Sequence, residues 1–241
     1  MLLKGLLWLL TLPAVAQAQF TFTTNSGAIT ITGYTGSGGA VIIPSTTNGL
    51  AVTSIGDSAF QSCASLTSVT IPNGVTRVGN LAFFSCANLT QVAIPGSVTS
   101  LGNFAFESCL LLTGVYFAGD APSLGATVFG YPIVPGSYDS MAVVYYRPGA
   151  SGWGASFGGL PTVGWNPQVQ TRGAGFGVPA GGFGFTIAGS SNLVVVVEAC
   201  TNPANPCWVP VRTEILTGGS AYFSDSQWAI YPARYYRLRS P

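Results

Sequence analysis

The sequence contains no histidine and very little charge. Its 241 residues include eight Lys or Arg and seven Asp or Glu residues. Without histidine, Ser-His-Asp catalysis, Cys-His catalysis and metal sites that need an imidazole ligand are all excluded. A charge balance near zero provides no electrostatic attraction for nucleic acid or anionic lipid. We therefore expect no nucleic-acid partner, no cofactor and no metal.

The few acidic residues also form no local catalytic motif. They are spread over the chain as Asp57, Glu107, Asp120, Asp139, Glu198, Glu214 and Asp225. A distant carboxylate pair, as in glycosidases, stays open because such a pair has no fixed spacing in sequence. The glycine-rich stretch "GAGFGVPAGG" lacks the lysine of a phosphate-binding loop. We predict that the protein is not an enzyme.

Apolar runs long enough to span a membrane, roughly 20 residues, are missing as well. The N-terminal run from Leu6 to Val15 is shorter, follows Lys4, and precedes Ala16 and Ala18 in an A-x-A arrangement. This pattern is typical of a signal peptide, residues 1–18, cleaved after Ala18. We expect a protein that is secreted, extracellular or on the cell surface, with no transmembrane segment.

What the sequence has in abundance is repetition at an interval of 23 residues. A period in this range predicts stacked coils, each of which buries its apolar face against its neighbours. The matching positions are Leu66, Leu89 and Leu112; Val69, Val92 and Val115; Ile71, Ile94 and Phe117; Ile55, Val78 and Leu101; Phe60, Phe83 and Phe106; and Cys63, Cys86 and Cys109.

Each coil is predicted to contain two short strands. One runs from Leu66 to Ile71 and is ended by Pro72; the other lies around Ile55 and is followed by a glycine, which we expect to supply a special backbone conformation. Weaker copies extend the stack at "AVIIP" (40–44) and "LGATVF" (124–129). The insertion "GYPIVPGSYDS" delays the next strand to about 143–146, which suggests a capping coil.

The stretch "IGDSAFQSCASLTSVTIP" and its two successors resemble the BspA-type leucine-rich repeats of bacterial surface proteins. This resemblance is specific over about residues 40–118. It implies a leucine-rich-repeat solenoid in a protein that is secreted or surface-exposed. It also implies a non-catalytic binding or adhesion scaffold for protein partners, or for host and matrix components.

The C-terminal part changes character. Residues 167–182 are rich in glycine and polar residues and are predicted to be a linker. Residues 183–241 consist of short β-prone runs between turns, which predicts a small β-sandwich-like module. They resemble a small all-β module at the C-terminus of many exported bacterial proteins, at 197–202, 208–211, 223–225 and 234–237. The predicted fold is thus mainly β: a solenoid with capping coils over 19–166, a linker, and the module.

Candidate binding residues lie on the outward face of the repeated strand. The outward positions are Ser68, Thr70, Gln91, Ala93, Gly114 and Tyr116, of which we select Ser68, Thr70, Gln91 and Tyr116. An ordinary solvated sheet face is the competing interpretation. A neutral polar face suits uncharged partners such as glycans or peptide backbone. We expect a monomer that binds a protein.

The alternative function is carbohydrate binding. The site would be either the same solenoid face or the aromatic residues of the C-terminal module: Trp208, Trp228, Tyr222 and Tyr231.

The five cysteines divide into two groups. Cys63, Cys86 and Cys109 repeat with the coils and are expected to be buried thiols, because their side chains point in parallel. Cys200 and Cys207 close a short loop, "CTNPANPC", and are a candidate disulfide in an exported protein.

Overall fold

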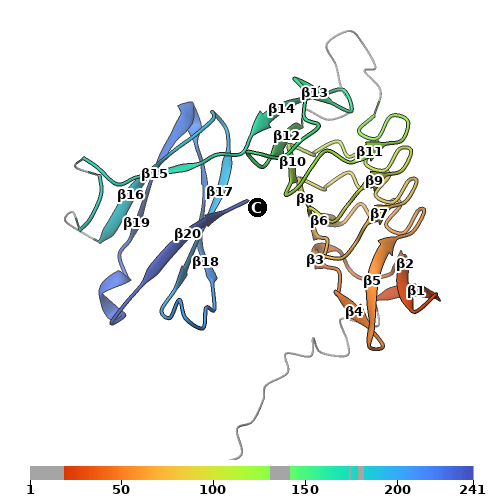
Figure 1. The fold of residues 1–241 in the computed structure, drawn as a ribbon, viewed down its shortest axis with the longest axis horizontal. Coiled ribbons are helices and arrows are strands. Elements are labelled where there is room, and N and C mark those ends of the chain that lie inside the picture. The colour runs from red at the N-terminus through yellow and green to blue at the C-terminus, as the bar shows by residue number, and fades with distance from the viewer. Residues whose placement is uncertain (1–18, 131–141, 174, 179–181, 241) are drawn as a thin grey trace, which may run out of the picture.

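The computed structural model of the chain describes residues 19–130, 142–173, 175–178 and 182–240. These residues form a solenoid of stacked coils and a small two-sheet module beside it (Figure 1). The chain is therefore mainly β, with the repeat solenoid and the small β module that the sequence predicts. The predicted signal peptide, residues 1–18, and most of the predicted insertion after Phe129 lie outside the described residues.

Two sheets run along the solenoid, and each coil adds one strand to both. The first sheet contains β1 (Phe20–Asn25), β2 (Ala28–Tyr34), β5 (Leu50–Ile55), β7 (Arg77–Val78), β9 (Ser100–Leu101) and β11 (Ser123–Leu124), with β4 (Thr46–Thr47) paired to β5. The second contains β3 (Gly39–Ile42), β6 (Leu66–Thr70), β8 (Gln91–Ile94), β10 (Gly114–Phe117), β12 (Val143–Tyr146), β14 (Leu160–Gly164) and β13 (Ser156–Phe157).

Strand pairing within the repeats is parallel and follows the 23-residue interval. Ser68 pairs with Gln91, which pairs in turn with Gly114. The weaker copies join the same stack, because β3 pairs with β6 and β11 pairs with β9. The strand predicted after the insertion is β12, at Val143–Tyr146. Antiparallel hairpins close the ends, β1 with β2 at one end and β13 with β14 at the other.

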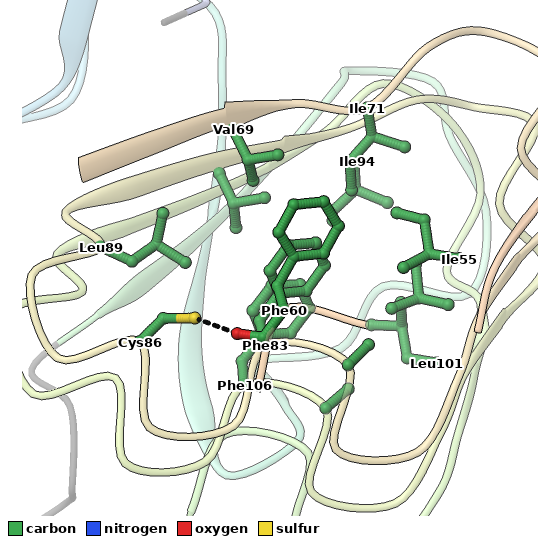
Figure 2. Packing of buried hydrophobic residues seen from close by; sticks show 14 of the residues in the cluster. Ile55, Phe60, Val69, Ile71, Phe83, Cys86, Leu89, Ile94, Leu101 and Phe106 are labelled. Atoms are coloured by element: carbon green, nitrogen blue, oxygen red, sulfur yellow. Dashed lines mark hydrogen bonds between the residues drawn. The ribbon is translucent and has the colours of Figure 1, made fainter. Parts of the chain in front are cut away.

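A row of stacked phenylalanines fills the interior of the solenoid (Figure 2). Phe60, Phe83, Phe106 and Phe129 form this interior ladder, with ring centroids 4.9, 5.0 and 5.9 Å apart along the row. All four rings are buried. Burial of one such side chain contributes about 1.5–3 kcal/mol, so identical residues at one interval provide a continuous core.

The repeated glycines have a different role from the one predicted. Gly79 and Gly102 are not in the left-handed backbone region. A Cβ on Gly102 would lie 2.5 Å from the backbone nitrogen of Asn80, and one on Gly79 would meet the preceding coil equally closely. Glycine is required here because consecutive coils touch at this point. The next residue continues the contact: the backbone N–H of Asn103 donates to Oδ1 of Asn80, 2.8 Å away.

The C-terminal module consists of two three-stranded antiparallel sheets. One contains β15 (Gln168–Gln170), β16 (Phe183–Ala188) and β19 (Ser220–Asp225); the other contains β18 (Val209–Ile215), β17 (Val194–Cys200) and β20 (Tyr235–Arg239). Two short 3-10 helices, η1 (Thr217–Gly219) and η2 (Trp228–Ile230), connect them. The predicted linker at 167–182 is wrong in part, because β15 pairs with β16 and already belongs to the module.

The solenoid and the module share a hydrophobic cluster. Tyr116 and Tyr145 of the solenoid pack with Ile187, Leu193 and Val195 of the module. The module therefore packs against the outward face of the second solenoid sheet.

Candidate functional site

The outward face of the second sheet contains a row of aligned residues, here called the outer row. Register places one residue from each successive strand in this row, because parallel neighbours pair directly. The members are Ile42, Thr70, Ala93, Tyr116, Tyr145 and Val163. A parallel row beside it contains Ser68 and Gln91. All four predicted binding residues thus lie on one face, as the alternation of a strand requires.

The predicted exposure of Tyr116 is wrong. Its side chain is only 3% exposed and its ring stacks on that of Tyr145, with centroids 4.8 Å apart. Burial raises the pKa of the Tyr116 hydroxyl, and the neighbouring Tyr145 raises it further. The hydroxyl of Tyr145 donates to the carbonyl of Asn192, and Nε1 of Trp165 donates to the carbonyl of Val194. These aromatic residues attach the module to the solenoid. Tyr116 therefore borders the open part of the face and offers little exposed surface to a ligand.

The other predicted residues line an open groove next to this contact. The groove has a volume of about 670 Å³. Ser68, Thr70, Gln91 and Tyr116 line it on the solenoid side, and Arg239 and Ser240 line it from the module. The sequence placed the first four residues together, but it gave no sign of Arg239, which is separated from them by more than a hundred residues.

Arginine residues give this groove a positive side. The carboxylate of Glu198 accepts from Nε of Arg237, 2.7 Å away, and from Nε of Arg239, 2.5 Å away. Burial raises the pKa of Glu198, but the two guanidinium groups outweigh it and leave the pKa below its ordinary value. One carboxylate facing two guanidinium groups leaves an excess positive charge.

A smaller adjoining cavity of about 230 Å³ adds Arg147, beside Arg239 and Trp165. Among the residues that the structure describes, no acidic one lines either the groove or this cavity. The predicted preference for uncharged partners therefore fits the solenoid side of the groove but not the module side.

Comparison with known proteins gives the repeats a family. Residues 40–132 match the family described as "BspA type Leucine rich repeat region", in six copies. The repeats of this chain belong to that family. The match begins at the strand β3 and includes every member of the interior ladder.

Solved structures with leucine-rich repeats resemble about half of the chain. The T. pallidum leucine-rich repeat protein is 27% identical over 53% of this chain and 69% of its own, with a TM-score of 0.47. A leucine rich cell surface protein from Faecalibacterium prausnitzii is 29% identical over 55% of this chain and 36% of its own, with a TM-score of 0.44. This chain thus spans about a third of the length of that protein. No curated protein matches the sequence.

Two of the three repeat cysteines, Cys86 and Cys109, are buried in the solenoid interior as predicted, whereas Cys63 is only half-buried. The thiol of Cys86 donates to the carbonyl of Phe60, and that of Cys109 to the carbonyl of Phe83, at 3.1 and 3.2 Å (Figure 2 shows the first). Burial raises the pKa of Cys109 to about 12. Such thiols are poor nucleophiles, because the thiolate is the reactive form.

The second pair of cysteines lies in the module. Cys200 is buried and Cys207 is exposed, and both line one pocket. Neither is bonded in the structure, so their disulfide stays a prediction.

Two aromatic residues proposed for sugar binding already have partners. The guanidinium of Arg237 lies 4.6 Å from the ring centroid of Trp208, and that of Arg234 lies 4.1 Å from that of Tyr231. Trp228 is half-buried and Tyr222 is exposed. A sugar stacks on a free face of an aromatic ring. In Trp208 and Tyr231 an arginine already occupies one of the two ring faces.

Within the described ranges, no cluster of three or more acidic, cysteine or histidine residues could hold a metal ion. Those ranges also include no helix that is long and apolar enough to cross a membrane.

Proposed function

We propose that this chain is an exported bacterial protein, secreted or displayed at the cell surface, that binds a protein partner without catalysis. The partner would lie on the part of the outward solenoid face that the module leaves open. Support for export comes from the signal-peptide pattern at 1–18, and support for binding comes from the use of stacked repeats as preformed binding surfaces.

The groove is the observation that carries the proposal. Its solenoid side presents a hydroxyl at Ser68, another at Thr70 and an amide at Gln91. Hydroxyl and amide groups both donate and accept hydrogen bonds, so they can pair with the backbone of a partner. The strands beneath them are fixed by the coils on either side, so the surface needs no rearrangement on binding.

The same lining supports a non-catalytic role. Acid–base or nucleophilic catalysis needs a titratable group whose pKa is near the working pH, or an activated nucleophile. The residues that line the groove include neither a carboxylate nor a thiol. Its one strongly charged group, Arg239, is held by Glu198.

An array of purified extracellular-matrix and cell-surface proteins, probed with full-length mature protein, tests this function. Gln91→Glu replaces an amide that donates and accepts hydrogen bonds with a carboxylate that can only accept them, and Gln61→Glu makes the same change at an exposed turn elsewhere on the solenoid. We expect protein binding that Gln91→Glu weakens at least tenfold and that Gln61→Glu leaves unchanged. Equal binding by both variants would contradict the site. A glycan array probed in parallel tests the carbohydrate alternative, which predicts sugar binding sensitive to Gln91→Glu.

A further inference from the structure

We propose that the free edge of β20 binds an extended acidic peptide segment of the partner, which adds a strand to the module. This inference rests on the protein-binding function proposed above and specifies the segment that is bound. An exposed sheet edge presents a row of unpaired N–H and C=O groups, and addition of a peptide strand to such an edge is a recurrent mode of recognition.

The two edges of the β18-β17-β20 sheet differ. On one edge, β18 contains Pro210, and its pairing with β17 shifts register between Val197 and Glu198. Proline and a register irregularity both prevent further pairing, so this edge is protected. On the other edge, β20 contains no proline and pairs with β17 in continuous register from Tyr235 to Arg239. Among the described strands, β20 pairs with β17 alone.

Open space follows β20 over its whole length. Beside its first residues, a cavity of about 270 Å³ is lined by Tyr236, Phe176 and Phe183, and the rings of Phe183 and Tyr236 are stacked with centroids 5.2 Å apart. At its end, Leu238 and Arg239 line the 230 Å³ cavity, and Arg239 also lines the 670 Å³ groove. β20 runs with its C-terminal end toward the solenoid, so these cavities lead from the module to the outward face of the repeats (Figure 1).

The charge of this path indicates the chemistry of the peptide. Arg237, Arg239 and Arg147 line it, and none of the described residues that line the three cavities is acidic. Arg147 is exposed, and within the described part of the chain it takes part in no ion pair. A guanidinium in a groove is a ready partner for a carboxylate. The peptide would therefore carry Asp or Glu where it passes Arg147 and Arg239.

The other end of the path favours an apolar side chain. Phe176 is 42% exposed although it borders a cavity lined by the aromatic rings of Phe183 and Tyr236. Tyr236 and Arg239 are three residues apart on one strand, which corresponds to roughly 10 Å and places their side chains on opposite faces of the sheet. We thus expect an apolar and an acidic residue an odd number of positions apart, about three, in the peptide.

Selection from a phage-displayed library of random eight-residue peptides on the immobilised full-length protein tests the inference. We expect enrichment of peptides with β-branched or aromatic residues, an acidic residue at one end and no internal proline. Arg147→Glu should reduce binding of the enriched peptides at least tenfold, whereas Arg77→Glu, on the opposite solenoid sheet, should not. Failure to enrich acidic peptides, or equal effects of the two variants, would overturn the proposal.

Amide hydrogen exchange with a synthetic copy of an enriched peptide locates the contact. Slower exchange over residues 235–239 is expected. Protection restricted to residues 66–94 would overturn strand addition while supporting the groove on the solenoid. Protection of 235–239 with none over 66–94 would support strand addition and count against the proposed solenoid surface. A concentration-dependent dimer that protects 235–239 without peptide would show that a second copy occupies the edge, and would also overturn the proposal.

Discussion

The interior ladder and the outer row belong to the same coils and differ in how they use repetition. The interior ladder keeps phenylalanine at every step from Phe60 to Phe129. The outer row varies from strand to strand, from Thr70 through Ala93 to Tyr116, and repeats a residue only at Tyr145 among its described members. A buried ladder is stable only when each member fits the next one, whereas an outward position has no such constraint. The interior ladder therefore stabilises the stack of coils, whereas the residue types of the outer row determine where the module covers the outward face.

Within the outer row, the residue type separates an open half from a covered half. Ile42 and Thr70 are exposed, while Tyr116 and Tyr145 are buried beneath the module. The aromatic residues supply apolar area for docking, and the smaller ones leave a groove beside it. One sheet face thus provides both an internal interface and a free surface.

The largest expected effect concerns the interior ladder. Phe83→Ala should destabilise the protein by about 3–5 kcal/mol, because it removes ring contacts on both sides and leaves a cavity. Phe129→Ala removes contact with only one ring of the ladder, 5.9 Å away, and should cost less. Chemical denaturation of both variants measures the difference. Equal losses would argue that the ladder does not act as a continuous stack.

The covered half of the outer row should show the next largest effect. Tyr116→Ala should cost about 2–4 kcal/mol, because it removes the stacking on Tyr145 and the packing against the module. In the part of the chain that is described, the Tyr116 hydroxyl is buried and forms no well-aligned hydrogen bond, although the backbone N–H of Val194 is close to it. Tyr116→Phe should therefore be near neutral. Thermal unfolding of both variants checks this pair, and a costly Tyr116→Phe would mean that the hydroxyl is bonded after all.

The module differs from the solenoid in depending on a buried carboxylate. Glu198 is 4% exposed, and its pKa is lowered in the folded protein. Its contribution to stability is therefore complete above its ordinary pKa of about 4.3, and is lost as pH falls through the lower folded value. Glu198→Gln should cost about 1.5–3 kcal/mol at neutral pH and weaken the loss of stability in acid. Denaturation between pH 7 and pH 3 tests this, and an unchanged acid dependence would contradict the assignment.

The open half of the outer row should be the most tolerant. Thr70→Ala should change the free energy of unfolding by no more than about 0.5 kcal/mol, because Thr70 is exposed and forms no side-chain hydrogen bond within the described residues. Equilibrium denaturation alongside Tyr116→Ala makes the comparison. A loss similar to that of Tyr116→Ala would show that the open half is also covered.

The repeat interval made the solenoid predictable from sequence. Positions such as Phe83 and Val92 recur at a fixed spacing, and the period directly sets which residues stack. The candidate site could be predicted only in part. Strand alternation identified Ser68, Thr70 and Gln91, but the burial of Tyr116 depends on a contact with a module that shows no repetition.

Two other features had no signal in the sequence. The position of Arg239 in the groove depends on how the module docks, which no local pattern encodes. The close contact between coils at Gly102 exists only in the assembled stack. From the sequence, the repeated glycine predicted a special backbone conformation instead.

Hydroxyl-radical footprinting of the full-length protein tests the division of the outer row most directly, because it measures side-chain accessibility residue by residue. We predict that Tyr116 and Tyr145 are protected, while Tyr222 and Tyr235, each 45% exposed in the module, are oxidised rapidly. Oxidation of Tyr116 at the rate of Tyr235 would contradict the account, because the module would then not cover this half of the solenoid face.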